Sequence, residues 1–339
     1  IKQSLHDKRS KLLMTQLVSI KFPLKLLISM LVISSFSLCA KQLNFNKYNQ
    51  GNSIEFNYAW LDENEMQQTF AFQLTKKDLS NEYRHFKALR PSLLRMFSLK
   101  QLKIAISELD PRAGKVKILP SQTNIEFTLQ SQDPKWPAET EAKLNQVYLD
   151  SLKEYLRQEY YIEFNGIIGS EQSNTIHFKP DHQRFVNEGT EATAPIIKAL
   201  REKMPNATAR VMAKFLLSWI QTIPYDEMES RTTSNGAGYL PPIHVLNHNK
   251  GDCDSKATLF AHIMKQLYPR LRMVMIYLPE HALLGMNVSV LSDDKSIEVD
   301  GLNFVLTEPV GPALIPFADA ADSSLRYIDS GIYNIEKLY

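Results

Sequence analysis

The chain is poor in cysteine, since only Cys39 and Cys253 occur among its 339 residues. A disulfide framework of the kind that holds small secreted domains together is therefore excluded. Glycine is also sparse, at 12 residues, and no segment is repetitive or of low complexity. With 44% hydrophobic residues, the chain is long enough for two globular domains, each with its own core.

An excess of basic residues is absent outside the first 40 positions. Residues 1–40 hold six Lys and Arg against Asp7 alone, whereas residues 41–339 hold 33 basic and 36 acidic residues, a net charge of −3. We see no basic stripe with interleaved aromatic residues, so no nucleic-acid partner is expected. A phosphate-binding glycine loop and a dinucleotide fingerprint are also missing, and we expect no cofactor.

No apolar run is long enough for a comfortable membrane span, which needs roughly 20 residues. The apolar stretch at 26–33 follows Lys21 and Lys25 and ends in small residues near Ala40. This pattern is typical of an export signal, with cleavage after Ala40 and a periplasmic or secreted mature chain. An uncleaved anchor and acylation of Cys39 are the alternatives, and they are the only membrane attachment we expect. Translation from Met14 would give a more ordinary signal peptide.

The pattern of apolar residues predicts an α+β protein with two domains. Residues 53–61 and 68–74 alternate with period two and predict a hairpin, and 124–129 and 160–164 predict further strands. A long helix is expected over 139–160. Together these elements form a predicted N-terminal α+β domain over 41–182, in which no catalytic residue types gather.

The predicted second domain covers 183–339. Helices are expected at 192–204 and 208–221, followed by a long loop at 222–250 that leads directly into Cys253. After the cysteine helix, strands are predicted at 271–278 and 281–290, a short strand ending at Val299, and a last strand at 302–308. The order is a helix with a thiol, a strand with a histidine, and a strand that ends in an acid.

Cys253 is the candidate nucleophile. It begins an amphipathic helix, because the small or apolar residues Ala257, Phe260, Met264 and Leu267 recur at steps of three or four. Free N–H groups and the helix dipole at this end favour a thiolate. The flanking Asp252, the expected N-cap, and Asp254 oppose it, so a histidine is needed to activate the thiol.

Residues 206–312 resemble the transglutaminase-like superfamily. The resemblance rests on Gly251-Asp252-Cys253-Asp254 with 259–261, on 281–283, and on 304–309. It implies a papain-like domain in which the cysteine helix packs on an antiparallel sheet, with Cys253 as nucleophile and His281 as base. Glu308 is the positional match for the acid, although the family usually has aspartate there. Asp300, at an Asp-Gly turn, is the alternative.

An oxyanion on the substrate would be held by the backbone N–H of Cys253 and by one side-chain donor. Gln221, Tyr225 and Tyr239 are the candidates. Residues two apart in a strand share one face, so His281 lies on the same face as Leu283 and Gly285. The missing side chain of Gly285 could therefore leave room for substrate beside the imidazole. His244 and His248 have a helical metal-pair spacing, but the prolines before them predict a loop, and no metal site is expected.

The leading functional hypothesis is an exported thiol enzyme that acts on amide bonds of a protein or peptide of the cell envelope through a thioester. Water as acceptor gives a protease or amidase, which we favour, and an amine gives a cross-linking enzyme. The alternative is a non-catalytic binding module of the cell envelope. The departure from the family pattern at Glu308, and Leu283 where many members have tryptophan, motivate this alternative.

Overall fold

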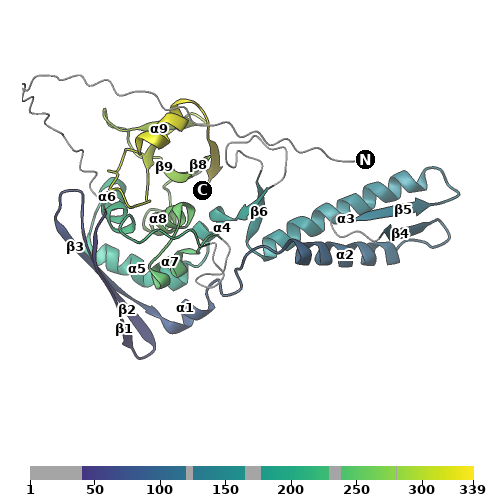
Figure 1. The fold of residues 1–339 in the computed structure, drawn as a ribbon, viewed down its shortest axis with the longest axis horizontal. Helices are drawn as coiled ribbons and strands as arrows, with labels where there is room; N and C mark the ends of the chain where they lie inside the picture. The colour runs from purple at the N-terminus through teal and green to yellow at the C-terminus, as the bar shows by residue number, and fades with distance from the viewer. Residues whose placement is uncertain (1–39, 120–124, 165–176, 229–237, 280) are drawn as a thin grey trace, which may run out of the picture. The chain divides into compact units, whose positions relative to one another are not determined.

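The computed structural model describes residues 40–119, 125–164, 177–228, 238–279 and 281–339 (Figure 1). The protein is a mixed α+β protein, and in the part of the chain that the structure describes every sheet is antiparallel. The expected export signal lies outside the described residues, apart from Ala40. Within the described ranges no helix is both long and apolar enough to cross a membrane.

The first sheet has the order β1-β2-β3, formed by β1 (Gln42–Gln50), β2 (Ser53–Leu61) and β3 (Gln67–Thr75). The predicted hairpin is β2 and β3, and β1 was not expected. Alternate residues of β2 and β3 are buried, which is the period-two pattern of a sheet with one face against a core. Trp60 is one of these, and its indole N–H donates to the Ser218 hydroxyl at 3.1 Å.

A helical segment follows this sheet. It contains α1 (Lys76–Asn81), α2 (Pro91–Ser107) and α3 (Trp136–Gln158), with a hairpin of β4 (Lys115–Leu119) and β5 (Glu126–Gln130) between the two long helices. Helices α2 and α3 pack on each other around a small core of Leu102, Ala105 and Leu144. A two-stranded sheet of β6 (Tyr161–Phe164) and β7 (His177–Pro180) comes next. The predicted helix and strands in this region lie within a few residues of those observed.

The remaining elements surround α8 (Cys253–Leu267). The helices α4 (His182–Asn187), α5 (Thr190–Lys203), α6 (Ala209–Ile220) and α7 (Pro242–His248) all contact α8. A sheet of order β10-β11-β9-β8-β12 contacts it through β9, so that α8 lies between helices and sheet (Figure 1). The strands are β8 (Met273–Leu278), β9 (His281–Met286), β10 (Ser296–Val299), β11 (Leu302–Thr307) and β12 (Asn334–Lys337), and α9 (Asp322–Asp329) precedes β12.

The hydrophobic core crosses the boundary that the sequence suggested at residue 182. One continuous cluster joins Phe56, Tyr58 and Trp60 of β2 to α4–α8 and to β8 and β9. The aromatic face of the β1–β3 sheet is covered by α6, where Trp219 meets Tyr58 edge-on at 5.1 Å between ring centroids. Residues 41–182 and 183–339 therefore share the main core, because the β1–β3 sheet needs the helices after residue 182 to bury its inner face.

Two local predictions have clear outcomes. The expected loop at 222–250 contains α7, which begins at Pro242; proline is tolerated there because the first helical N–H needs no intrahelical partner. Helix α7 ends at His248, and its C-cap residue Asn249 has a left-handed φ of 49°. The Asp300-Gly301 turn is a hairpin turn between β10 and β11 with φ of 51° and 74°, as the dipeptide predicts.

Candidate active site

Cys253 is the first residue of α8, and its side chain is partly buried. Asp252 is the N-cap, as expected, and its carboxylate accepts the backbone N–H of Ser255 at 3.1 Å. The apolar face predicted from Ala257, Phe260 and Met264 is fully buried. This packing fixes the start of the helix and therefore the place of the sulfur.

His281 and Glu308 are hydrogen-bonded partners. His281 begins β9 and Glu308 directly follows the neighbouring strand β11, so the sheet pairing brings the two residues together. Imidazole Nε2 lies 2.9 Å from Glu308 Oε1, and Oε2 of the same carboxylate accepts the backbone N–H of Ala321 at 3.0 Å. The other imidazole nitrogen, Nδ1, is thereby left for a different partner.

The Glu308 carboxyl is ionised in this setting. Burial acts to raise its pKa, but the hydrogen bond with His281, and further bonds from Ala321 and the Ser324 side chain, outweigh burial and hold the pKa below its ordinary value. The side chain of Glu308 is 7% exposed and that of His281 is 25% exposed. A buried carboxylate behind a more accessible imidazole can fix the tautomer of the ring and stabilise its cation.

The thiol of Cys253 lies beside this pair. The backbone N–H of Ala282, the residue after His281, is close enough to the thiol to lower its pKa. The structure thus brings together Cys253, His281 and Glu308. It does not bring Asp300 to them, because the Asp300 side chain is 60% exposed and forms an ion pair with Lys337 at the hairpin turn.

The thiol is not a resting thiolate. Burial raises the pKa of Cys253 well above its ordinary value, and the negative charges of Asp254 and Asp252 raise it further. The N–H groups of Ala282 and Asp254 act in the opposite direction but do not offset this. The lowering expected from the helix N-terminus is therefore outweighed by desolvation and two neighbouring carboxyls.

The pKa values of these two carboxyls are shifted in opposite directions. Burial and the nearby charge of Asp254 raise the pKa of Asp252 well above its ordinary value. Burial acts to raise the pKa of Asp254 as well, but its hydrogen bond from His182, at 3.0 Å, lowers it overall. His182 therefore holds the carboxylate that directly follows Cys253 in the chain.

His182 extends this contact into a buried polar network. Its Nδ1 lies 2.6 Å from the Tyr277 hydroxyl, which donates to Glu336 on β12. Lys179 donates to the same Glu336 carboxylate at 2.7 Å. Burial acts to raise the pKa of Glu336, but His182 and Lys179 outweigh it and lower that pKa to about 2. A chain of hydrogen bonds therefore joins the start of α8 to β12.

Lys256 is a residue of the site that sequence reasoning missed. It lies one turn after Cys253, it is fully buried, and its ammonium donates to the backbone carbonyl of Ile223. Burial lowers its pKa to about 8, although the neighbouring Asp252 and Cys253 act to raise it. The sequence could have indicated Lys256, because it lies three residues after Cys253, next to the residues that form the apolar face of the helix.

The three candidate oxyanion donors lie in different settings. Gln221 is buried, and its amide nitrogen donates to the carbonyls of Glu308 and Ile315, both at 2.9 Å, so its protons are already used. Tyr239 is completely buried among aromatic rings such as Phe185. Neither residue can therefore serve the substrate in this arrangement.

Tyr225 has the only setting of the three that suits the role. It is 49% exposed and pairs through its backbone with Gly251, two residues before the thiol. Burial of part of the ring, and after it the neighbouring Cys253 and Asp252, raise the pKa of Tyr225 to about 12. The phenol therefore keeps its proton at neutral pH and remains a hydrogen-bond donor.

Gly285 does not leave room for substrate. A Cβ atom at this position would lie 2.8 Å from Cβ of Phe304 and 2.9 Å from Cγ2 of Val274. These side chains on the neighbouring strands fill the space, so the expectation of a substrate cavity at Gly285 is wrong. The glycine instead permits close packing of the sheet.

His244 and His248 do lie on a helix, α7, although a loop was expected there. Their rings are 6.2 Å apart, and the His244 Nε2 is 3.0 Å from the carbonyl oxygen of Glu82. Among the described residues no group of three His, Cys, Asp or Glu side chains is arranged to hold a metal ion. Burial lowers the pKa of His244 to about 4, so this ring is neutral.

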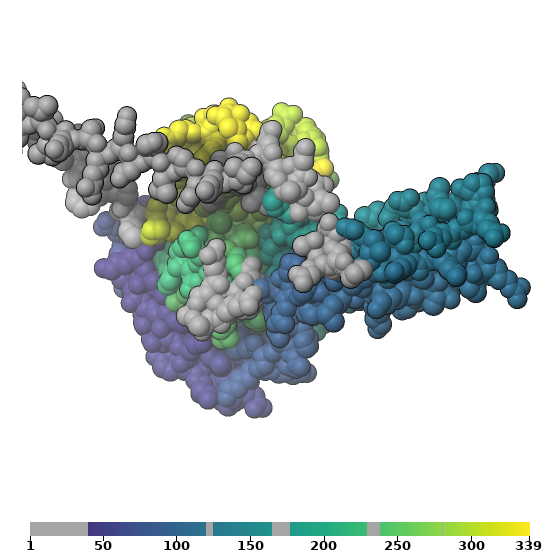
Figure 2. Space-filling model, turned by 45° about the vertical axis from the view of Figure 1, so that its right-hand side comes forward, coloured from purple at the N-terminus to yellow at the C-terminus, as the bar shows by residue number. Residues whose placement is uncertain are grey.

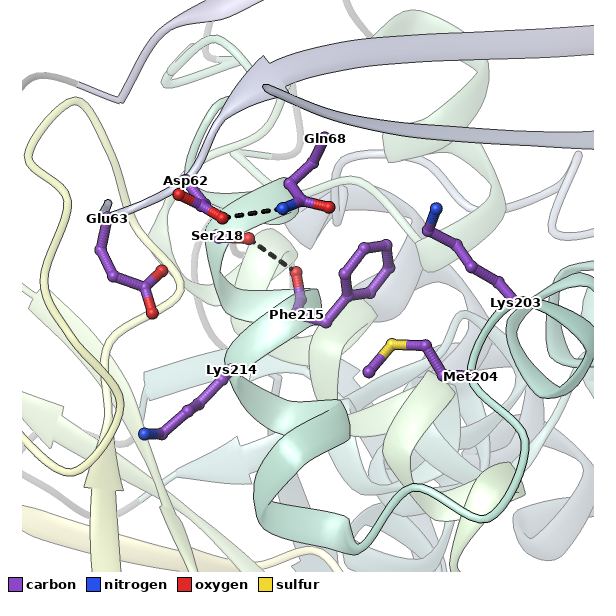
Figure 3. Close-up of a pocket in the computed structure, with 8 residues that line it drawn as sticks. All are labelled: Asp62, Glu63, Gln68, Lys203, Met204, Lys214, Phe215 and Ser218. Carbon is purple, nitrogen blue, oxygen red and sulfur yellow. Dashed lines mark hydrogen bonds between the residues drawn. The ribbon is translucent and has the colours of Figure 1, made fainter. Parts of the chain in front are cut away.

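A separate pocket of about 320 Å³ lies between the β2–β3 turn and helices α5 and α6 (Figure 3). Its buried polar groups already have partners. Asp62 accepts the side-chain amide of Gln68 at 2.8 Å and two backbone N–H groups of its own turn. The Ser218 hydroxyl donates to the carbonyl of Phe215 at 2.9 Å. The pocket therefore has the hydrogen bonding of a stabilised turn and contains none of the three residues of the candidate site.

Comparisons of this chain with protein-family models, with curated proteins and with solved structures find no match.

Proposed function

We propose that this protein is an exported thiol enzyme of the transglutaminase-like type, with a papain-like arrangement of Cys253, His281 and Glu308, acting on amide bonds. The observation that carries the proposal is the bond between His281 Nε2 and Glu308, with the thiol against the backbone N–H of the residue after His281. Cys253, His281 and Glu308 would act as nucleophile, base and orienting acid, with the base between the other two, as acyl transfer needs.

The raised pKa of the thiol favours general-base catalysis over a preformed ion pair. The Cys253 sulfur attacks the carbonyl carbon of the substrate amide while its proton passes to Nδ1 of His281. Glu308 stabilises the imidazolium that forms. The proton then passes to the nitrogen of the leaving amine, the C–N bond breaks, and a thioester remains.

Release of the product needs a second nucleophile at the thioester carbon. Water gives up a proton to the imidazole as it attacks, the C–S bond breaks, and the proton returns to the sulfur. The tetrahedral oxyanion in both halves would be held by the backbone N–H of Cys253 and by the Tyr225 hydroxyl. Hydrolysis is our preferred outcome, and an amine in place of water would give transamidation.

The test is activity on a library of N-terminally quenched peptides and on glutamine-containing proteins, followed by release of amine or ammonia. Wild-type protein is compared with Cys253→Ala and with Tyr239→Phe, a matched control whose hydroxyl is buried away from substrate. Turnover that is lost in Cys253→Ala and kept in Tyr239→Phe supports the proposal. Full turnover in Cys253→Ala would refute the mechanism.

The second candidate function is a non-catalytic binding module of the cell envelope. The burial of the thiol and the two carboxyls beside it favour this alternative, because each disfavours the nucleophilic form of Cys253. Alkylation separates the two functions. A binding module predicts slow alkylation at neutral pH that does not depend on His281, whereas the enzyme predicts a rate that falls when His281 becomes alanine.

A further inference from the structure

Helix α2 has two opposite faces, and only one of them is covered. Ser98, Leu102 and Ala105 are buried, and Ser98 accepts a hydrogen bond from Ser151 of α3 at 2.9 Å. The opposite side carries the exposed residues Leu93, Met96, Lys100, Lys103, Ile104 and Ser107. At 3.6 residues per turn these six fall within an arc of about 100°, and we call this surface the α2 stripe.

The α2 stripe exposes large apolar side chains. Met96 is 63% exposed, Ile104 is 45% exposed and Leu93 is 40% exposed. Single exposed apolar residues are ordinary, but here three lie along one face of a 17-residue helix. Figure 2 shows α2 and α3 at the surface of the molecule, in blue and teal.

The same region carries a local excess of positive charge. Helix α2 contains Arg95, Lys100 and Lys103 and no acidic residue. Residues 84–117 hold nine Lys and Arg against two Asp and Glu, whereas the rest of residues 41–339 hold 24 against 34. The expectation of no basic patch, made from the whole mature chain, overlooks this segment because acidic residues elsewhere cancel its charge.

We propose that the α2 stripe binds the surface of an anionic phospholipid membrane, with α2 parallel to the bilayer. Leu93, Met96 and Ile104 would enter the boundary between headgroups and acyl chains, and Lys100 and Lys103 would contact lipid phosphates. Lysine suits this role because its long apolar stem can lie along the helix while the ammonium reaches the headgroups.

The composition of the stripe favours lipid over an acidic protein. Protein interfaces are enriched in Tyr, Trp and Arg and depleted in Lys, whereas the exposed cations of the stripe are both lysines and its apolar residues are aliphatic. Single-stranded nucleic acid is disfavoured for a related reason, since the stripe has no aromatic side chain on which a base could stack. The proposal does not depend on any chemistry at Cys253.

The test is sedimentation of the full chain with vesicles of phosphatidylglycerol and phosphatidylethanolamine, compared with vesicles of phosphatidylcholine alone. Binding to the anionic vesicles that weakens with added salt is expected. Lys100→Glu combined with Lys103→Glu should weaken binding by at least about 25-fold, since each lysine near an anionic surface contributes about fivefold. Met96→Gln leaves the charge unchanged and should weaken binding several-fold.

The matched control is Lys198→Glu combined with Arg201→Glu, which makes the same change in net charge on exposed positions of α5. It should bind the anionic vesicles almost as well as wild type. Absence of binding would overturn the proposal and leave an acidic protein or nucleic acid to be tried. Equal binding of the two double variants to the anionic vesicles would also overturn the proposal. That result is expected if residues 1–39 or the net charge alone bind the protein to the vesicles.

Discussion

Replacement of Glu308 by glutamine tests the candidate site most directly. The shape of the side chain is nearly kept, but the ionised acceptor that faces His281 at 2.9 Å becomes neutral. Its new NH₂ group can donate to Nε2, which moves the ring proton to Nδ1 and removes the lone pair that should accept the thiol proton. Both effects act on the same step, the activation of Cys253.

The size of the effect follows from the bond that is lost. A buried hydrogen bond to a charged group contributes about 1.5–3 kcal/mol, which corresponds to about 10- to 150-fold in rate. We therefore expect Glu308→Gln to slow iodoacetamide alkylation of Cys253 at pH 7 by that factor. The rate is measured by mass spectrometry of the peptide that contains Cys253, so that Cys39 does not interfere.

Asp300→Asn is the matched control, since it neutralises the rival acid at an exposed hairpin turn. It should leave the alkylation rate unchanged. Thermal unfolding of both variants shows whether they are folded, so that a slow alkylation rate is not attributed to unfolded protein. An alkylation rate in folded Glu308→Gln equal to wild type would refute the assignment of Glu308, and an equal slowing in Asp300→Asn would refute its specificity.

Four further outcomes are expected. Lys256→Met should raise the apparent pKa of alkylation at Cys253 by about one unit, because a buried positive charge near the thiol is lost. Gly285→Ala should destabilise the fold by about 1–3 kcal/mol in urea unfolding, because its Cβ would overlap neighbouring strands. The folded-state pKa of Glu336, about 2, lies below its unfolded value of 4.5. The ionised side chain therefore stabilises the fold fully above pH 4.5, and this stabilisation is lost as the pH falls through 2. Glu336→Gln should remove up to about 3 kcal/mol of this pH dependence of the free energy of unfolding. Trp60→Ala should cost about 3–5 kcal/mol and lower the circular-dichroism midpoint and the midpoint for exposure of Cys253 together, since they share one core.

Local patterns in the sequence predicted much of the fold. The alternation in β2 and β3, the apolar face of α8 and the Asp-Gly turn each depend on residues close together in the chain, and each is observed. Helix α7 was missed because Pro241 and Pro242 were interpreted as loop residues, although proline at the first helical position is favourable. The core that crosses residue 182 was not predicted, because the helices that cover the aromatic face of the β1–β3 sheet lie far away in sequence.

The candidate site was only partly predictable for the same reason. Cys253, His281 and Glu308 follow one another along elements whose order the sequence indicates, and the structure brings them together. The partner of Asp254 lies 72 residues earlier in the chain, on α4. Contacts over such separations depend on how helices and sheets pack on one another, and hydrophobic periodicity does not predict that packing. The expectation of a thiolate at Cys253 was wrong because burial, which depends on the complete fold, has the largest effect on the pKa of the thiol.

The bonds that run from Asp254 through His182 and Tyr277 to Glu336 also have a consequence for the order of synthesis. Strand β12, which carries Glu336, is the last of the described elements to leave the ribosome, and α8 emerges some 70 residues earlier. Until β12 pairs with β8, the charges around His182 lack their outer carboxylate. A nascent chain would thus carry Cys253 in an unfinished electrostatic setting until residue 336 has been synthesised and β12 has paired with β8.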